Sequence, residues 1–317
     1  MKTVNKNQYI NNQSRSSRRL RVLISAYSCE PYRGSEPAIG WNISLKMSEY
    51  HDVWVLTRSN NKTVINQYLS NNPQKGLYFI YHDLPNWLSF WKSKGRGVNL
   101  YYYLWQLTSI PKILKKNLEI HFHLSHHVTF CRYWSPSCLA FLPIPFIWGP
   151  VGGGELTPKS LFRTLSFKER LYEILKFLVL KMSELDPFVI KTAKKASLVY
   201  ATTRDTAKRI KNMNVKNIEC LTQVGIDDLG IESNNFNNEV CRFVSMGRMI
   251  HWKGFLLGLE AFSNVSIENV EFWFIGDGVC RKSLEEFTQK NNLSTKVKFF
   301  GELSREETIE HLKLCDV

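Results

Sequence analysis

Two cations stand between an expected strand and an expected helix in SMGRMIHWKGFLLGLEAF, residues 245–262. Arg248 follows Gly247 at the end of the strand, and Lys253 stands beside Gly254 just before the helix. The free N–H groups and the dipole at a helix N-terminus favour phosphate. Arg adds a planar fork of donors and Lys a point charge. This stretch predicts a phosphate-binding site, and spacing alone leaves a surface turn with solvated charges as the alternative.

Glycine-rich turns follow three other expected strands. Gly34 lies in YRGSEPAIGW at the first strand-to-helix turn, where the missing Cβ lets backbone approach a ligand closely. Because this turn does not read G-x-G-x-x-G, a dinucleotide-dependent dehydrogenase is disfavoured. FIWGPVGGGE, residues 146–155, has three consecutive glycines, but Pro150 interrupts it and no helix is expected to open there. IGDG, residues 275–278, is more typical of a tight turn than of direct catalysis.

Four histidines gather in the stretch HFHLSHHVTF, namely His121, His123, His126 and His127. Imidazole is a common metal ligand, but no Asp, Glu or Cys is spaced to complete a metal site. We therefore expect a single working histidine at a strand-to-loop junction rather than a metal centre.

Alternating strands and helices must position these residues. Short apolar runs predict buried strands at residues 21–26, 53–57, 78–81, 121–124, 146–148 and 198–202. After a polar, Asn-rich stretch the pattern restarts, with strands expected at residues 242–246, 270–275 and 297–300 and helices at 255–262 and 281–290. Ser304 is expected to cap a further helix. This alternation is typical of parallel, doubly wound α/β sheets.

The pattern divides the chain into four segments. Residues 1–20 carry five basic and no acidic side chains and are expected to form a disordered arm. Residues 21–228 form an expected N-terminal α/β domain, and residues 229–240 an interdomain linker. Residues 241–317 form a second α/β unit with three apparent strands.

The 317-residue chain is strongly basic, with 42 Lys and Arg against 28 Asp and Glu and a formal net charge of +14. This excess favours an anionic partner, and a basic solvated surface is the alternative. Because no helix-turn-helix, RNP or zinc signature is present, we do not expect nucleic acid to be that partner.

The seven cysteines are scattered without a CxxC pair, which fits a reducing cytoplasm. The N-terminus lacks the apolar core of a secretory signal, and no apolar run is long enough to span a bilayer.

Aromatic and basic residues alternate without an acid in residues 86–117. The aromatic residues are Trp87, Phe90, Trp91, Tyr101, Tyr102, Tyr103 and Trp105, and the basic ones are Lys92, Lys94, Arg96, Lys112, Lys115 and Lys116. This mixture suits the headgroup region of an anionic membrane, and an amphipathic basic stretch at residues 161–182 adds to it. The alternative is that these aromatic side chains form core.

Taken together and in order, these motifs resemble family 4 glycosyltransferases, which are retaining nucleotide-sugar enzymes of the GT-B fold. The matching stretches, from about residue 21 to residue 317, are CEPYRGSEPAIGW, HHVTF, PFIWGPVGGGE, TTRDTA, VGID, GRMIHWKGFLLGLEAF, FIGDG and VKFFGEL. The resemblance implies two Rossmann-like domains facing a cleft. It implies that the first holds mainly the acceptor and the second mainly the nucleotide sugar.

The resemblance also implies roles for single residues. Arg248 and Lys253 match the pair that neutralises the donor diphosphate, because charge develops there as the nucleoside diphosphate departs. Gly34 matches the first-loop glycine near the donor phosphate. His126 looks like the active-site histidine near the reacting sugar, with His127 as the fallback.

Two sets of loops follow from the same resemblance. The implied donor-side loops contain Gly247, Gly276, Asp277 and Gly278. The implied acceptor-side loop contains Gly152, Gly153, Gly154 and Glu155. No catalytic metal and no cofactor are implied, and the donor substrate is a UDP- or GDP-sugar. Retention is expected through same-face attack, in which the leaving phosphate helps to deprotonate the acceptor hydroxyl.

The sequence ends in LCDV, where the family continues into a Glu-x7-Glu motif that holds the donor sugar and ribose. We therefore expect a fragment with an incomplete second domain and little transferase activity alone. The expected acceptor is lipid-linked or a polysaccharide, in the assembly of cell-surface glycans such as lipopolysaccharide. The expected location is the cytoplasm or the inner face of the membrane. The alternative is a non-catalytic protein that binds a sugar nucleotide or an acceptor and scaffolds another enzyme.

Overall fold

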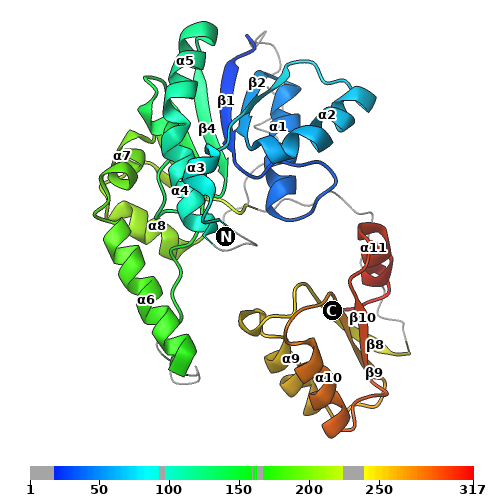
Figure 1. The fold of residues 1–317 in the computed structure, drawn as a ribbon. Helices are drawn as coiled ribbons and strands as arrows, with labels where there is room; N and C mark the ends of the chain where they lie inside the picture. Colours follow the sequence, from blue (N-terminus) through cyan, green and yellow to red (C-terminus); the bar gives the residue numbers. More distant parts are fainter. Residues whose placement is uncertain (1–17, 93–96, 159, 161, 163–166, 224–238) are drawn as a thin grey trace, which may run out of the picture. The chain divides into compact units, whose positions relative to one another are not determined.

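The computed structural model describes residues 18–92, 97–158, 160, 162, 167–223 and 239–317. The chain divides into two compact units, Met1–Gly225 and Ile226–Val317, and each is described by itself (Figure 1). Most of the expected arm and most of the expected linker at residues 229–240 lie outside the described residues.

The N-terminal unit is built on a seven-stranded parallel sheet with the order β3-β2-β1-β4-β5-β6-β7. The strands are β1 (Arg21–Ala26), β2 (Asp52–Thr57), β3 (Leu77–Tyr81), β4 (Leu124–Thr129), β5 (Phe146–Val151), β6 (Leu198–Ala201) and β7 (Ile218–Cys220). The strand order reverses between β1 and β4, and in such sheets ligands bind outside the carboxyl ends of the strands at this point. The expected doubly wound α/β class is confirmed.

Helices cover both faces of this sheet (Figure 1). They are α1 (Glu36–Ser48), α2 (Lys62–Asn71), α3 (Asn86–Ser89), α4 (Val98–Thr108), α5 (Ile110–Ile120), α6 (Phe167–Ser183), α7 (Pro187–Lys195) and α8 (Arg204–Lys211), with short 3-10 turns η2 (Ser59–Asn61) and η3 (Cys138–Phe141). Val22 of β1 packs in one apolar cluster with Trp41 of α1. Leu23, on the opposite face of the strand, packs in a second cluster with Trp105 of α4. Because β1 is buried on both faces, its sequence is apolar at nearly every position.

The C-terminal unit contains a three-stranded parallel sheet with the order β10-β9-β8. Its elements are β8 (Cys241–Met246), η5 (His251–Lys253), α9 (Phe255–Ser263), β9 (Val270–Ile275), α10 (Arg281–Lys290), β10 (Val297–Gly301) and α11 (Arg305–Lys313). Ser304 and Glu307 form the capping box that starts α11, as expected for Ser304. After α11 the chain returns to β8, where the Val244 N–H donates to the Val317 carbonyl at 2.8 Å.

Two expectations about strands differ from the structure. The strand expected at residues 121–124 is wrong, because α5 continues to Ile120 and His121 ends it in a left-handed conformation (φ 56°). The strand in this region is β4, which begins at Leu124 and whose sequence, LSHHVT, is too polar to be recognised as a buried strand. The short strand β7 at the sheet edge was not expected.

The aromatic and basic segment at residues 86–117 divides between core and surface. Tyr101, Tyr102 and Trp105 are buried, so the core alternative holds for them. Trp87 and Phe90 are 73% and 82% exposed. Among the described aromatic residues of this segment, Trp87 and Phe90 are the ones exposed as a membrane-contacting surface would require.

Candidate functional site

In the C-terminal unit, two loops at the carboxyl edge of the sheet are packed backbone to backbone. The Gly247 N–H donates to the Ile275 carbonyl at 2.9 Å, and the Met249 N–H donates to the Asp277 carbonyl at 2.8 Å. A Cβ on Gly276 would lie 2.2 Å from the Gly247 carbonyl oxygen. A Cβ on Gly278 would lie 2.4 Å from the Met249 carbonyl oxygen. Glycine at positions 276 and 278 therefore allows the β9–α10 loop to support the β8–α9 loop.

Arg248 and Lys253 lie on the supported β8–α9 loop. Both side chains are exposed, and neither forms an ion pair with any residue that the structure describes. Lys253 ends η5, and Gly254 turns the chain in a left-handed conformation (φ 76°) into the first turn of α9. Two unpaired cations thus lie on the short loop that leads to a helix N-terminus, an arrangement that can bind an oxyanion such as phosphate.

Asp277, which was placed in a donor-side loop, serves the turn itself. Its carboxylate accepts from the Gly278 N–H at 2.6 Å and pairs with Arg281 at 2.9 Å. The backbone hydrogen bond and the Arg281 guanidinium hold the pKa of Asp277 below its usual range. The tight-turn interpretation of IGDG accounts for these contacts.

The N-terminal unit has a polar pocket at the carboxyl ends of its strands, beside the point where the strand order reverses. Its volume is about 190 Å³. The residues that line it are Tyr27, Ser28, Glu30, Arg33, Pro37, Arg58, Asn60, Asn61, Lys92, Val98 and Phe130. Three of them are cations and one is a carboxylate, so the pocket suits an uncharged or anionic group better than a cation.

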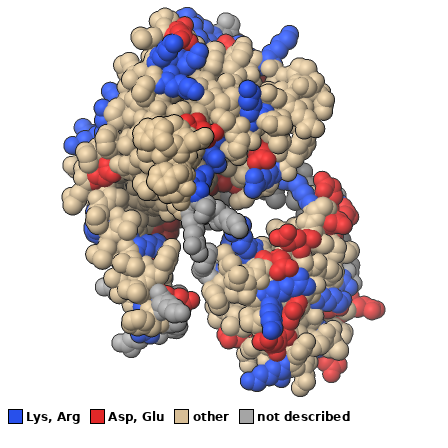
Figure 2. All heavy atoms as spheres, viewed as in Figure 1, with Lys and Arg blue, Asp and Glu red and all other residues tan. Residues whose placement is uncertain are grey.

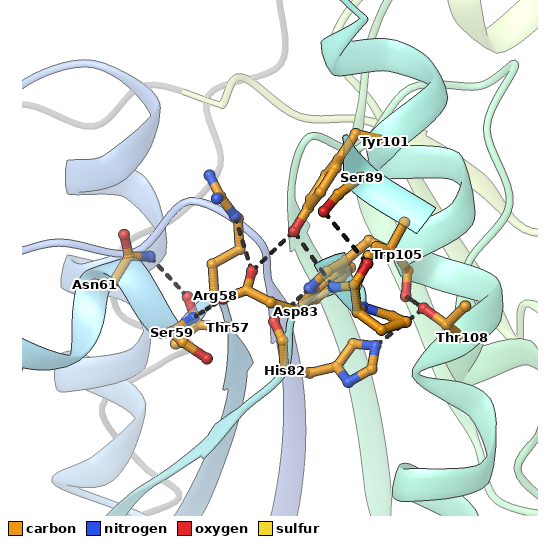
Figure 3. Close-up of polar contacts among 12 residues, drawn as sticks. Thr57, Arg58, Ser59, Asn61, His82, Asp83, Ser89, Tyr101, Trp105 and Thr108 are labelled. Carbon is orange, nitrogen blue, oxygen red and sulfur yellow. Dashed lines mark hydrogen bonds and ion pairs between the residues drawn. The ribbon is translucent and has the colours of Figure 1, made fainter. Parts of the chain in front are cut away.

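Arg58 and Asp83 fix one wall of this pocket (Figure 3). Arg58 follows β2 and Asp83 follows β3, and Arg58 Nε donates to Asp83 Oδ1 at 3.2 Å. The carboxylate also accepts from the Ser59 N–H at 3.0 Å and from the Tyr101 hydroxyl at 3.1 Å. Because its acceptors are filled from three elements, Asp83 holds the guanidinium in one place.

Tyr27 and Lys92 line the pocket beside Arg58. The Tyr27 hydroxyl is buried beside the Arg58 guanidinium and has no partner in good hydrogen-bonding geometry among the residues that the structure describes. Burial raises the pKa of Tyr27 to about 12, although the Arg58 guanidinium beside it acts in the opposite direction. Lys92 Nζ lies 3.8 Å from the centroid of the Tyr101 ring. Burial and the charge of Arg58 lower the pKa of Lys92.

The two candidate catalytic histidines are neighbours on β4 and have different surroundings. His127 is 1% exposed, and its Nε2 lies 2.8 Å from the Tyr102 hydroxyl oxygen. His126 is only half-buried, and its Nε2 donates to the Gly149 carbonyl at 2.7 Å. Burial lowers the pKa of His126, so the ring is neutral at pH 7 and Nδ1 is its acceptor nitrogen. Of the two, His126 is the less buried residue.

The GGGE loop, residues 152–155, is tied to the start of α8. Glu155 accepts hydrogen bonds from the hydroxyls of Thr203 and Thr206 and from the Gly153 N–H. Burial alone raises the pKa of Glu155, but these hydrogen bonds outweigh it and hold the pKa below its usual range. A Cβ on Gly154 would lie 2.7 Å from Thr206 Cα. Glycine at 154 and the Glu155 carboxylate therefore hold this loop in place.

The remaining glycines of the expected site have different surroundings. A Cβ on Gly152 would lie 3.2 Å from Thr202 Oγ1, and Gly153 has φ 87°. Gly34 is exposed between β1 and α1, and a Cβ there would meet nothing within 4 Å. No neighbour within its own unit requires a glycine at position 34. Gly34 belongs to one unit and Arg248 and Lys253 to the other.

The sequence analysis did not single out Arg58, Asp83 or Tyr27. The available signal was position, because Tyr27, Arg58 and His82-Asp83 each follow directly after a strand. Their association depends on the strand order, which the sequence does not state.

Within the described ranges, no group of three or more His, Cys, Asp or Glu residues is placed to hold a metal ion. No described helix is long and apolar enough to cross a membrane.

Comparisons of the sequence and the structure with known proteins identify the fold. Residues 228–317 match the family model described as Glycosyl transferases group 1. The search of curated proteins returned no match. Among solved structures, the chain is similar to the lipopolysaccharide outer core galactosyltransferase WaaB, with a TM-score of 0.58 and 10% identity over 93% of this chain and 71% of that chain.

Two further solved structures are similar over the same region. A glycosyltransferase from Rickettsia africae has a TM-score of 0.56 and 12% identity, over 94% of this chain and 72% of that chain. Anabaena HepE in complex with UDP and glucose has a TM-score of 0.54 and 13% identity, also over 94% and 72%. At such identities the likeness shows the fold. The chain has the α/β architecture of GT-B glycosyltransferases, and its C-terminal part carries the group 1 sequence match.

Proposed function

We propose that this protein is a retaining glycosyltransferase of family 4 type. It transfers a sugar from a nucleotide-diphosphate sugar to an acceptor in the assembly of cell-surface glycans. The observation that carries this proposal is a pair of exposed cations, Arg248 and Lys253, on the loop that leads into α9, neither of which pairs with a carboxylate of the described residues. That loop lies within the segment that matches Glycosyl transferases group 1.

Charge on the leaving group explains why these cations matter. As the glycosidic bond breaks, the departing nucleoside diphosphate gains negative charge, and fixed cations stabilise the transition state more than the ground state. In this proposal the leaving phosphate takes the proton of the acceptor hydroxyl on the same face of the sugar. His126, with its neutral ring, lies near the reacting sugar. No metal ion or cofactor is part of the proposed mechanism.

The proposed donor is a UDP- or GDP-sugar. Structures of HepE contain UDP, glucose or UDP-glucose, which makes UDP-glucose the first donor to test. The implied donor-side contacts are Arg248, Lys253 and Gly34, with the backbone of the loops at Gly247 and Gly276–Gly278. The implied acceptor-side contact is the GGGE loop.

We further propose that the N-terminal unit docks peripherally on an anionic membrane, at the cytoplasmic face, through α6. Most of the large apolar side chains of α6 are exposed, including Tyr172 at 66% and Met182 at 72%. Figure 2 shows largely uncharged surface in the region of this helix. The next helix, α7, adds the exposed cations Lys194 and Lys195. An apolar helix beside lysines fits an anionic lipid surface, and a lipid-linked acceptor would be reached there.

The membrane proposal is tested by sedimentation with vesicles of a 3:1 mixture of neutral and anionic phospholipid at low salt. We expect the protein to sediment with these vesicles and not with neutral ones. Replacing Tyr172 and Met182 by Ser should weaken sedimentation, whereas Ser at Val265, an exposed apolar residue of the other unit, should not. No sedimentation at low salt would contradict the docking proposal.

Turnover distinguishes an enzyme from a scaffold. We expect the 317-residue chain to bind UDP and to turn over UDP-glucose or another nucleotide sugar in a panel only slowly, measured as released nucleoside diphosphate, in line with the low activity expected of this chain alone. Binding of UDP without turnover of any donor would instead favour the non-catalytic alternative. Absence of both binding and turnover would contradict the proposed function.

A further inference from the structure

The pocket beside Arg58 is lined by a buried hydroxyl, that of Tyr27, which has no partner in good hydrogen-bonding geometry among the described residues. The Tyr27 side chain is 4% exposed. A buried hydroxyl without a partner costs free energy, so structures rarely leave one without a reason. A ligand oxygen within the pocket would supply the missing partner.

The charges around Tyr27 indicate what kind of ligand this is. Arg33 is paired with Glu30 at 3.0 Å, and Arg58 is paired with Asp83 at 3.2 Å. Lys92 also lines the pocket, and no described carboxylate lies within ion-pairing distance of it. The pocket therefore carries one positive charge more than its carboxylates balance.

The position of Arg58 adds a second donor. Asp83 accepts from Nε, and this bond leaves the terminal nitrogens of the guanidinium unused by Asp83 (Figure 3). The carbon Cζ of Arg58 lies 5.3 Å from the centroid of the Tyr27 ring. The Tyr27 hydroxyl and the guanidinium thus belong to the same wall. A hydroxyl, a guanidinium and an ammonium around one small space form a donor set for an oxyanion.

We propose that this pocket binds an anionic group of the acceptor, a phosphate ester or a sugar carboxylate, through Tyr27, Arg58 and Lys92. The inference rests on the proposed function, because it takes the N-terminal unit to be the acceptor side. It adds the substrate class: the acceptor is an acidic glycan rather than a neutral one. The aromatic rings of Tyr27 and Phe130 in the same lining provide an apolar surface for the attached sugar ring.

Ligand-observed NMR titration of the full chain tests this proposal with four probes: inorganic phosphate, glucose 6-phosphate, glucuronate and glucose. We expect the charged sugars to bind about tenfold more tightly than glucose, the order expected for a hydrogen bond to a charged group. Preference for glucose 6-phosphate identifies a phosphate ester, and preference for glucuronate identifies a carboxylate. Equal affinity for glucose and both charged sugars would overturn the proposal.

Variants locate the binding. Lys92→Met removes a charge that no described carboxylate pairs with, and Tyr27→Phe removes one oxygen that has no well-formed hydrogen bond to a described residue. Each substitution should lower the affinity for the preferred charged sugar about three- to tenfold. Lys115→Met, an exposed lysine on α5 outside the pocket, is the matched control and should leave the affinity unchanged. If the variants bind the charged sugar as well as the control does, the anion binds elsewhere and the assignment to this pocket is wrong.

UDP binding is measured in the same samples to separate the two proposals. If UDP binds and charged sugars are not preferred, this inference fails and the proposed function stands. If charged sugars bind at the pocket and UDP does not, the donor assignment fails, and the pocket remains an anion site.

Discussion

The Gly276 and Gly247 backbones touch, so that a Cβ on residue 276 would lie 2.2 Å from the Gly247 carbonyl oxygen. Gly276 also has φ 119°, a conformation that L side chains rarely adopt. These two glycines join the β8–α9 loop, which carries Arg248 and Lys253, to the end of β9. The position of the proposed diphosphate site therefore depends on a contact that admits no side chain.

Gly276→Ala should destabilise the C-terminal unit by about 2–4 kcal/mol, because the methyl group clashes and φ is unfavourable. Urea unfolding followed by circular dichroism measures the change. Gly34→Ala is the matched control, since a Cβ there meets nothing within 4 Å, and its effect should stay within about 0.5 kcal/mol. Equal stability of the two variants would contradict the packing described for Gly276.

His127 should make the protein sensitive to acid. Burial lowers the pKa of His127 to about 3, whereas an unfolded His titrates near 6.5. The unfolded chain therefore binds a proton first, so this contribution to stability is complete above pH 6.5 and is lost as pH falls toward 3.

Urea unfolding of the wild type and His127→Gln at pH 8, 6 and 5 tests this. The slope of stability against pH should fall by up to about 1.4 kcal/mol per pH unit in the variant, which lacks one titrating proton. His82, whose pKa burial lowers to about 4, keeps a residual slope of the same sign. An unchanged slope would mean that His127 is not held neutral.

Glu155→Gln should weaken the attachment of the GGGE loop to α8. The carboxylate accepts from Thr203 and Thr206, and removing its charge should cost about 1–3 kcal/mol at pH 7. Because its folded pKa lies below the usual value, the wild-type advantage should shrink as pH falls below about 4.5. Unfolding measured at pH 7 and 4 shows the outcome, and a difference that grows at pH 4 would contradict the account.

His126→Ala should lower transfer by about 100-fold if this histidine contributes one hydrogen bond in the transition state. UDP affinity is the internal control and should not change, because His126 lies on β4 of the N-terminal unit whereas Arg248 lies in the C-terminal unit. Transfer measured at saturating donor gives the rate. A rate within twofold of the wild type would remove His126 from the proposed mechanism.

The sequence predicted the elements that bury apolar side chains on both sides. Strand 21–26 was placed correctly because every face of β1 is covered, which leaves an unbroken apolar run. β4 was misplaced because its buried residues include Ser125, His127 and Thr129. These residue types are polar, so a search for apolar runs does not identify them as part of a buried strand.

The pocket at Tyr27 was not predicted for a different reason. Most of its members follow the ends of β1, β2 and β4, whereas Lys92 follows α3 and Val98 begins α4. The strand order β2-β1-β4 brings these strand ends together. Arg248 and Lys253 could be singled out because they lie close together in sequence on one loop. Local motifs are therefore visible in the sequence, whereas sites assembled across a sheet require its topology.

The affinity for UDP, measured by isothermal titration calorimetry, tests the central claim most directly. The wild type should bind UDP, and replacing Arg248 and Lys253 together by Met should weaken it at least about tenfold, as expected for two charge-assisted contacts. The control replaces Lys290, an exposed lysine at the C-terminal end of α10, by Met, and this variant should bind UDP as the wild type does. Equal affinity of the double variant and the Lys290 control would contradict the assignment of Arg248 and Lys253 to the donor diphosphate.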